Sequence, residues 1–215
     1  MWQAQVFTLY PEFYPGPLSK GLYGKALAKN LWNLKVINIR DAAEDKHKTV
    51  DDTPYGGGSG MLMKADVLAK SLDKNKINGE KIIYLSPKGK KFDQFYAQEL
   101  SKQKSVSFIC GHFEGVDERI LSTRNIEEVS IGDYVLSGGE TASFVVIDSV
   151  LRLLPGVLGN EYSKKEESFE NGLLEYPQYT KPQIWEEKAV PDVLLSGDHN
   201  KIKHWRLSQS EAITR

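Results

Sequence analysis

Cysteine is nearly absent from this sequence, since Cys110 is the only one among its 215 residues. A single cysteine excludes a framework of intrachain disulfides. A dominant charge is also lacking, because 28 Lys and Arg residues stand against 29 Asp and Glu residues, which leaves a net charge of −1. This balance excludes the broadly basic surface that is typical of many nucleic-acid-binding domains.

Long hydrophobic runs are missing as well. No stretch of about 18 uncharged apolar residues is present to span a bilayer. The first six residues, Met-Trp-Gln-Ala-Gln-Val, lack the basic and apolar regions of a secretory signal peptide. These absences predict a soluble cytoplasmic protein that does not interact with a membrane.

Several cofactor and metal signatures are absent too. The sequence has no Gly-x-Gly-x-x-Gly after a predicted strand and no Gly-x-x-x-x-Gly-Lys-Ser/Thr, which excludes the ordinary dinucleotide fingerprint and the P-loop. It also lacks His-Glu-x-x-His and a His-x-Glu with a cysteine pair, so we expect no zinc site. Cys110 ends an apolar run, which favours a buried small hydrophobe over a nucleophile.

Apolar runs that alternate with amphipathic segments are the main pattern that is present. With 40% hydrophobic and 27% charged residues, the composition is that of a globular protein. The alternation predicts an α/β fold with a mostly parallel sheet. The strands are expected at residues 6–9, 34–39, 81–85, 106–110 and 129–131, and a long helix from about Gly138 to Pro155.

The predicted organisation has three parts. Residues 1–159 contain the alternating pattern and form the main domain. Six charged residues and almost no apolar ones occur in 160–170, so we interpret 160–176 as a flexible linker. Residues 177–215 form a small helical segment whose last helix begins near Asp198. About 40 residues cannot easily bury a core alone, so this segment should contact the main domain, a second subunit or a ligand.

Glycine is clustered in three loops, at 56–60, at 111 and 115, and at 132 and 138–139. The last two clusters directly follow predicted strands. Glycine allows a backbone to approach a ligand closely, and ligands of open α/β sheets bind at the carboxyl ends of the strands. Any one cluster is better explained by a tight turn, but three together favour a ligand site.

Long ordered motifs carry a more specific signal. They include Thr-Pro-Tyr-Gly-Gly-Gly-Ser-Gly at 53–60, Tyr-Leu-Ser-Pro at 84–87, Cys-Gly-His-Phe-Glu-Gly-Val-Asp at 110–117 and Gly-Asp-Tyr-Val-Leu-Ser-Gly-Gly-Glu at 132–140. Pro-Gly-Val-Leu-Gly at 155–159, Leu-Leu-Ser-Gly-Asp-His at 194–199 and Trp-Arg at 205–206 follow in order. From residue 7 to about 209, the sequence resembles the bacterial tRNA (guanine(37)-N1)-methyltransferases, the TrmD family of the SPOUT class.

This resemblance implies a fold and an activity. The fold would be a SPOUT-type α/β knot, a deep trefoil knot in a mostly parallel sheet, with a small and shortened C-terminal helical domain. The activity would be the transfer of a methyl group from S-adenosylmethionine to N1 of guanosine 37, next to the anticodon of tRNA. The resemblance also implies a homodimer and a possible dependence on Mg²⁺.

The resemblance assigns cofactor binding to the three loops after the strands. The adenine would lie among backbone groups of the 131–136 segment, and Glu114 would be a polar contact of the ribose or methionine end. The implied cofactor-binding residues are Tyr84, Leu85, Ser86, Pro87, Gly111, Glu114, Gly115, Ile131, Gly132, Tyr134, Leu136, Gly138 and Gly139.

Guanine N1 carries a proton at neutral pH, so its methylation calls for a general base and for a donor that stabilises charge on O6. The resemblance assigns these roles to Glu167 and Arg152. The family usually has Asp where this chain has Glu167, and Glu166 is an alternative base. The target guanine would be held by Asp52, Pro54, Gly57 and Gly58.

Without the resemblance, these residues have simpler interpretations. Glu167 and Glu166 are more typical of a solvated charged linker, and an arginine such as Arg152 on an apolar helix face more commonly extends its charge to solvent or pairs with a carboxylate. Asp117 and Arg119 are close enough in sequence to pair with each other. His112 and Phe113 replace the more usual Arg-Tyr of the family, which weakens any expectation of a phosphate contact there.

Two other function classes remain open. One is a non-catalytic protein that binds RNA or the cofactor, favoured by Glu167 and the short C-terminal segment. The other is a small-molecule α/β enzyme, favoured by the near-neutral charge. A local excess of lysine, six against Asp93 and Glu99 within residues 81–104, still allows a localised contact with tRNA.

Overall fold

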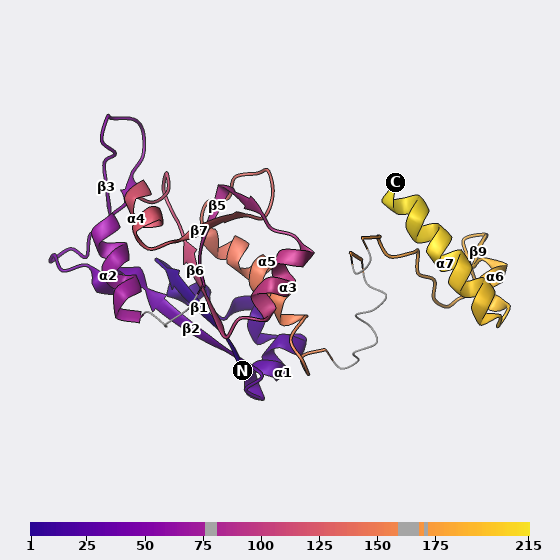
Figure 1. The fold of residues 1–215 in the computed structure, drawn as a ribbon. Coiled ribbons are helices and arrows are strands. Elements are labelled where there is room, and N and C mark those ends of the chain that lie inside the picture. Colours follow the sequence, from indigo (N-terminus) through magenta and orange to yellow (C-terminus); the bar gives the residue numbers. More distant parts are fainter. Residues whose placement is uncertain (76–80, 159–167, 170–171) are drawn as a thin grey trace. The chain divides into compact units, whose positions relative to one another are not determined.

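The structure, a computed structural model, describes residues 1–75, 81–158, 168–169 and 172–215. It contains two compact units, Met1–Leu158 and Gly159–Arg215, each of which is described here by itself (Figure 1). The unit boundary falls next to the predicted end of the main domain at residue 159. Within the predicted linker, residues 160–167 and 170–171 lie outside the described part of the chain.

The first unit is built on a five-stranded sheet in which every strand pair is parallel. The strand order is β2-β1-β6-β5-β7, and the strands are β1 (Trp2–Thr8), β2 (Trp32–Asn38), β5 (Lys81–Lys91), β6 (Ser105–Cys110) and β7 (Glu127–Ser130). The prediction of an α/β fold with a mostly parallel sheet is therefore confirmed.

Helices cover both faces of this sheet, and each face has its own hydrophobic cluster (Figure 1). Residues that alternate along β6 separate the clusters, because Phe108 joins one and Ile109 the other. The first cluster includes residues of α1 (Gly21–Ala28), α3 (Gln94–Ser101), α5 (Gly139–Leu151) and the short 3-10 helix η2 (Gly16–Ser19). The second includes residues of α2 (Ala65–Asn75), α4 (Glu118–Thr123) and the 3-10 helix η3 (Ile39–Ala42).

Side-chain caps fix the starts of two of these helices. The Asp93 carboxylate accepts a hydrogen bond of 2.8 Å from the Tyr96 N–H at the start of α3, and Asp117 accepts one of 3.0 Å from the Arg119 N–H at the start of α4. Such caps satisfy amide groups that have no partner within the helix. The long helix expected to reach Pro155 ends earlier, since α5 stops at Leu151 and Arg152 is its C-cap.

The second unit contains a short hairpin of β8 (Ile184–Trp185) and β9 (Lys188–Ala189), followed by α6 (Asp192–Leu195) and α7 (His199–Thr214). The Asp198 carboxylate accepts hydrogen bonds from the Asn200 and Lys201 amides and so caps α7. The sequence therefore located the start of the last helix correctly. In the described part of this unit, Ser210 is the only buried residue.

Candidate functional site

A cavity of about 270 Å³ lies in the first unit, among the loops that follow β5, β6 and β7. Carboxyl ends of parallel strands meet at one edge of a sheet, which is where open α/β sheets bind ligands. The predicted cofactor-binding residues come together here, because every one of them lines this cavity: Tyr84, Leu85, Ser86, Pro87, Gly111, Glu114, Gly115, Ile131, Gly132, Tyr134, Leu136, Gly138 and Gly139.

Other lining residues were missed by the sequence analysis. They are Lys88, His112, Phe113, Val116, Val129, Ser130, Val135, Ser137 and Ala142. Most of them lie inside the same sequence motifs as the predicted residues. Their position between two predicted cofactor-binding residues could have identified them.

The cavity wall formed by β5 departs from the prediction, because this strand was expected to end at Leu85. The strand continues to Lys91, and a bulge interrupts its pairing with β7, since both Leu85 and Lys90 pair with Val129. The bulged residues include Ser86 and Pro87, which line the cavity. A bulge of this kind redirects the chain toward a site while it keeps the strand in the sheet.

Gly139 joins the 131–138 loop to the 111–115 loop. Its N–H donates a hydrogen bond of 3.0 Å to the Gly111 carbonyl, and a Cβ at this position would lie 2.6 Å from the Cα of Cys110. Backbone atoms of a buried strand cannot move aside for a methyl group. This glycine therefore permits a close approach of two loops, which an isolated tight turn would not require.

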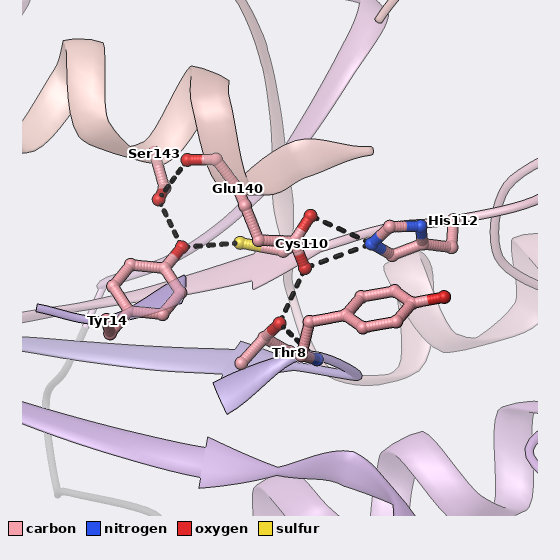
Figure 2. A network of polar contacts seen from close by, with 7 residues as sticks. Thr8, Tyr14, Cys110, His112, Glu140 and Ser143 are labelled. Atoms are coloured by element: carbon pink, nitrogen blue, oxygen red, sulfur yellow. Dashed lines mark hydrogen bonds and ion pairs between the residues drawn. The ribbon is translucent and has the colours of Figure 1, made fainter. Parts of the chain in front are cut away.

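Beneath the cavity lies a buried polar network (Figure 2). The Glu140 carboxylate, 3% exposed, contacts the His112 ring, with Nε2 at 3.0 Å from Oε1 and 2.8 Å from Oε2. The Thr8 hydroxyl donates to Glu140 Oε1 and accepts a hydrogen bond from the Tyr10 N–H. His112 thus points toward Glu140 from the cavity wall.

Neutral hydroxyl and thiol groups continue this network. The Tyr14 hydroxyl lies 2.5 Å from Ser143 Oγ and 3.4 Å from Cys110 Sγ (Figure 2). Burial raises the pKa of Cys110 to about 12 and raises the pKa of Tyr14 far above its ordinary value, with the nearby Glu140 charge adding to both shifts. Both groups therefore stay protonated near neutral pH, and the expectation that Cys110 is a buried small residue is confirmed.

The segment predicted to hold guanine lies on the hairpin of β3 (Asp51–Asp52) and β4 (Leu62–Met63). Asp52 and Pro54 line a second cavity of about 680 Å³, whereas Gly57 and Gly58 are exposed. The hairpin is tied to the cofactor loop by hydrogen bonds, since the Glu114 N–H donates to the Met61 carbonyl and the Met63 N–H to the Gly115 carbonyl. Two predicted sites are thus connected through the 111–115 loop.

The second cavity also includes Asp117 and Arg119. These two residues pair with each other, with Arg119 Nη2 at 2.6 Å from Asp117 Oδ2. The hydrogen bond with Arg119 holds the pKa of Asp117 below its ordinary value. The alternative that they form a local ion pair is therefore confirmed.

Arg152 is not among the residues that line the cavity at the ends of β5, β6 and β7. It caps the far end of α5, about 20 Å from Gly139 at 1.5 Å per helical residue. There it interacts with the Tyr23 hydroxyl, which donates a hydrogen bond of 2.8 Å to Asp148. Burial and the Asp148 carboxylate raise the pKa of Tyr23 to about 12, and Arg152 opposes this shift. The candidate bases Glu167 and Glu166 lie outside the described residues.

Neither a metal cluster nor a membrane span is found among the residues that the structure describes. No group of three or more His, Cys, Asp or Glu side chains there could hold a metal ion, so the expected Mg²⁺ has no support. None of the helices in the described ranges combines the length and apolar character needed to cross a bilayer.

Comparison with known proteins identifies relatives over the whole chain. Residues 2–215 match the family described as tRNA (Guanine-1)-methyltransferase TrmD. The chain is 82% identical over its full length to the tRNA (guanine-N(1)-)-methyltransferase of Pelagibacter ubique (strain HTCC1062) and covers 94% of that protein. It is 55% identical, again over 100% of its length, to the proteins of the same name from Bartonella tribocorum and Brucella canis, of which it covers 92% and 87%. The chain therefore belongs to the tRNA (guanine-1)-methyltransferase family, TrmD.

Proposed function

We propose that this protein transfers a methyl group from S-adenosylmethionine to N1 of guanosine 37 in tRNA. The observation that carries the proposal is the cavity at the carboxyl ends of β5, β6 and β7, whose lining contains every residue that the family resemblance assigns to the cofactor. Membership of the TrmD family supports a guanine-N1 methyltransferase acting on tRNA.

The residues of the cavity fit a nucleoside with a short polar chain. Val135, 86% exposed, and the Tyr134 and Leu136 side chains offer apolar contacts for a flat base. Among the described residues, the N–H groups of Val135 and Leu136 have no hydrogen-bond partner, so they are available to an adenine edge. Glu114 and Ser86 add polar groups for the ribose and the amino acid end.

S-adenosylmethionine supplies an electrophilic methyl group on a sulfonium, which needs no further activation. The task of the protein is therefore to align that methyl group with guanine N1 and to remove the N1 proton. We assign proton removal to Glu167 and stabilisation of the developing charge on O6 to Arg152. Asp52, Pro54, Gly57 and Gly58 would hold the guanine next to the cofactor loop.

The position of Arg152 supports a homodimer. Within one chain, α5 separates Arg152 from the cofactor cavity by most of its length. A second copy of the chain, in the homodimer that the family resemblance implies, would supply Arg152 to the cavity. We further propose that the 131–139 segment, which packs on Cys110 and Gly111, forms part of the deep trefoil knot of SPOUT proteins.

Methyl transfer to a defined tRNA tests this function. We expect the protein to transfer a labelled methyl group from S-adenosylmethionine to a tRNA transcript with guanines at positions 36 and 37. A transcript that has adenine at position 37 is the matched control and should remain unlabelled. Measurable cofactor binding without transfer to the first transcript would contradict the catalytic function and favour a protein that only binds the cofactor.

Mixed dimers test the site between two subunits. One chain would carry Gly139→Ala, which removes cofactor binding, and the other Arg152→Ala. If Arg152 acts on the cavity of the other subunit, the mixed dimer has one complete site and regains activity, although each parent dimer is inactive. Activity that stays at the level of the parents would show that Arg152 acts within its own chain or not at all.

A further inference from the structure

His112 and Glu140 form a close side-chain pair whose carboxylate is deeply buried. The Glu140 side chain is 4% exposed and that of His112 is 15% exposed. Burial of a carboxylate is costly unless hydrogen-bond donors compensate it. His112 supplies one, because its Nε2 lies within hydrogen-bond distance of both carboxylate oxygens.

The other titratable groups that face this pair are not cationic, so His112 is the main complement to the Glu140 carboxylate. Tyr10 packs edge-on against the His112 ring, with ring centroids 4.9 Å apart, and Cys110 and Tyr14 face Glu140 from β6 and from the segment after η1 (Pro11–Phe13). These three groups are neutral when protonated. Glu114 on the loop of His112 is acidic, and the Thr8 hydroxyl, which also bonds Glu140, carries no charge.

The pair connects two walls of the cofactor cavity. His112 belongs to the 111–115 loop, and Glu140 is in the first turn of α5, next to Gly138 and Gly139. Gly138 lies against the His112 ring so closely that a Cβ there would collide with Cε1. Any displacement of the His112 ring therefore changes the separation of the walls that contain Gly111 and Gly138.

We propose that His112 is a positioning residue for S-adenosylmethionine: its ring, paired with Glu140 through Nε2, holds the 111–115 loop against α5 and sets the cavity for the cofactor. The inference rests on the proposed function, since it concerns the same cavity. Cofactor affinity should therefore decrease when the contact between the His112 ring and Glu140 is removed.

Cofactor binding by the full-length protein tests this inference. The dissociation constant for S-adenosylmethionine would be measured by calorimetry at one pH for the wild type, His112→Gln and His112→Arg. Glutamine lacks the ring that packs against Tyr10 and Gly138, whereas arginine can bind both carboxylate oxygens of Glu140. We expect His112→Gln to weaken binding about tenfold, equivalent to about 1.4 kcal/mol.

His112→Arg is the discriminating variant. We expect it to bind the cofactor within about twofold of the wild type, because a guanidinium can bind both carboxylate oxygens of Glu140 and so restores the contact. A loss of affinity in His112→Arg equal to that in His112→Gln would overturn the role of the contact with Glu140.

Glu140→Gln gives a second approach should His112→Gln fold poorly. It removes the buried charge, and its cofactor affinity should fall as much as that of His112→Gln. The double variant, with both substitutions, should lose no further affinity, because the two residues act as one unit. Additive losses would overturn the pairing. Steady-state kinetics should show an increased KM for S-adenosylmethionine with kcat within about twofold, and the melting temperature without cofactor separates this role from general destabilisation.

His47→Gln is the matched control, because His47 is an exposed histidine of the same unit. Its cofactor affinity should equal that of the wild type. Wild-type affinity in His112→Gln would overturn the inference and leave the proposed function intact. If the wild type itself bound no S-adenosylmethionine, the proposed function would fail and the inference with it.

Discussion

The two units of the chain bury apolar side chains to very different extents. In Met1–Leu158, hydrophobic clusters occupy both faces of the sheet and contain fully buried Trp32 and Phe108. In the described part of Gly159–Arg215, Ser210 alone is buried, while Ile184 and Trp185 are 63% and 62% exposed. The first unit thus has the core of an independent domain, whereas the second presents its apolar side chains for contacts beyond itself.

We expect this difference to correspond to a division of roles. The cavity proposed for the cofactor is formed entirely by residues of the first unit, on loops held by buried strands. The second unit has an aromatic and basic surface, with Tyr179 near Trp205 and Arg206 stacked over Tyr176. Such surfaces suit unpaired nucleotide bases, which stack on aromatic rings and arginine planes. We therefore expect substitutions in the two units to affect different measurements.

The largest effect is expected from Phe108→Ala, in the core of the first unit. Removal of this ring should lower the free energy of unfolding by about 3–5 kcal/mol, because it leaves a cavity between β6 and the helices. Trp185→Ala, which removes an even larger but exposed side chain, should change it by less than about 0.5 kcal/mol. Urea unfolding measures both. Equal losses would show that the second unit has a core of its own around Trp185.

The sequence predicted the first unit better than the second for a physical reason. Strands buried on both faces appear as continuous apolar runs. The predicted strand at 106–110 therefore agrees with β6 to within one residue, and the predicted strand at 81–85 agrees with β5 up to its bulge. The continuation of β5 to Lys91 was missed, because Pro87 and Gly89 are typical of a loop and their place in a strand depends on the bulge against Val129.

The sequence predicted which loops form the candidate site, but not the hydrogen-bond network around Glu140. Glycine spacing and the family motifs indicated the cavity, since each loop directly follows a strand. The pairing of Glu140 with His112 and Thr8 could not be inferred, because these two residues are 28 and 132 positions from Glu140 and meet it only through the sheet order. The assignments of Glu167 and Arg152 as catalytic residues stay predictions.

Arg152→Ala should give the next largest effect, on catalysis alone. If Arg152 stabilises charge on guanine O6, kcat should fall about 100-fold while cofactor affinity stays within about twofold. Arg124→Ala is the matched control, since Arg124 forms an ion pair with Asp73 near the surface and such pairs contribute little. Single-turnover methylation and cofactor titration are the measurements. Equal losses of turnover and affinity would indicate that Arg152 acts through its contact with Tyr23.

A smaller effect is expected from Trp205→Ala in the second unit. Loss of one stacking surface should raise KM for tRNA about tenfold, in line with about 1–3 kcal/mol per stacked base, and leave the affinity for S-adenosylmethionine unchanged. Ser208→Ala, at an exposed position of the same helix, should leave both constants unchanged. A change in cofactor affinity with Trp205→Ala would contradict the separation of roles between the units.

The smallest effect is expected on the rate at which the Cys110 thiol is labelled. Because Cys110 lies in the core of the first unit, this rate measures exposure of that core alone. Burial raises its pKa to about 12, so at pH 8 the folded protein holds a protonated, inaccessible thiol that should not react with a thiol reagent within minutes. After denaturation the thiol is exposed, its pKa returns to the ordinary range, and one thiol per chain should react.

Because Cys110 and Phe108 lie in the same cluster, Phe108→Ala should accelerate labelling of the native protein, whereas Trp205→Ala should leave its rate unchanged. Acceleration by Trp205→Ala would mean that the second unit stabilises the core of the first, and the two regions would then not be energetically independent.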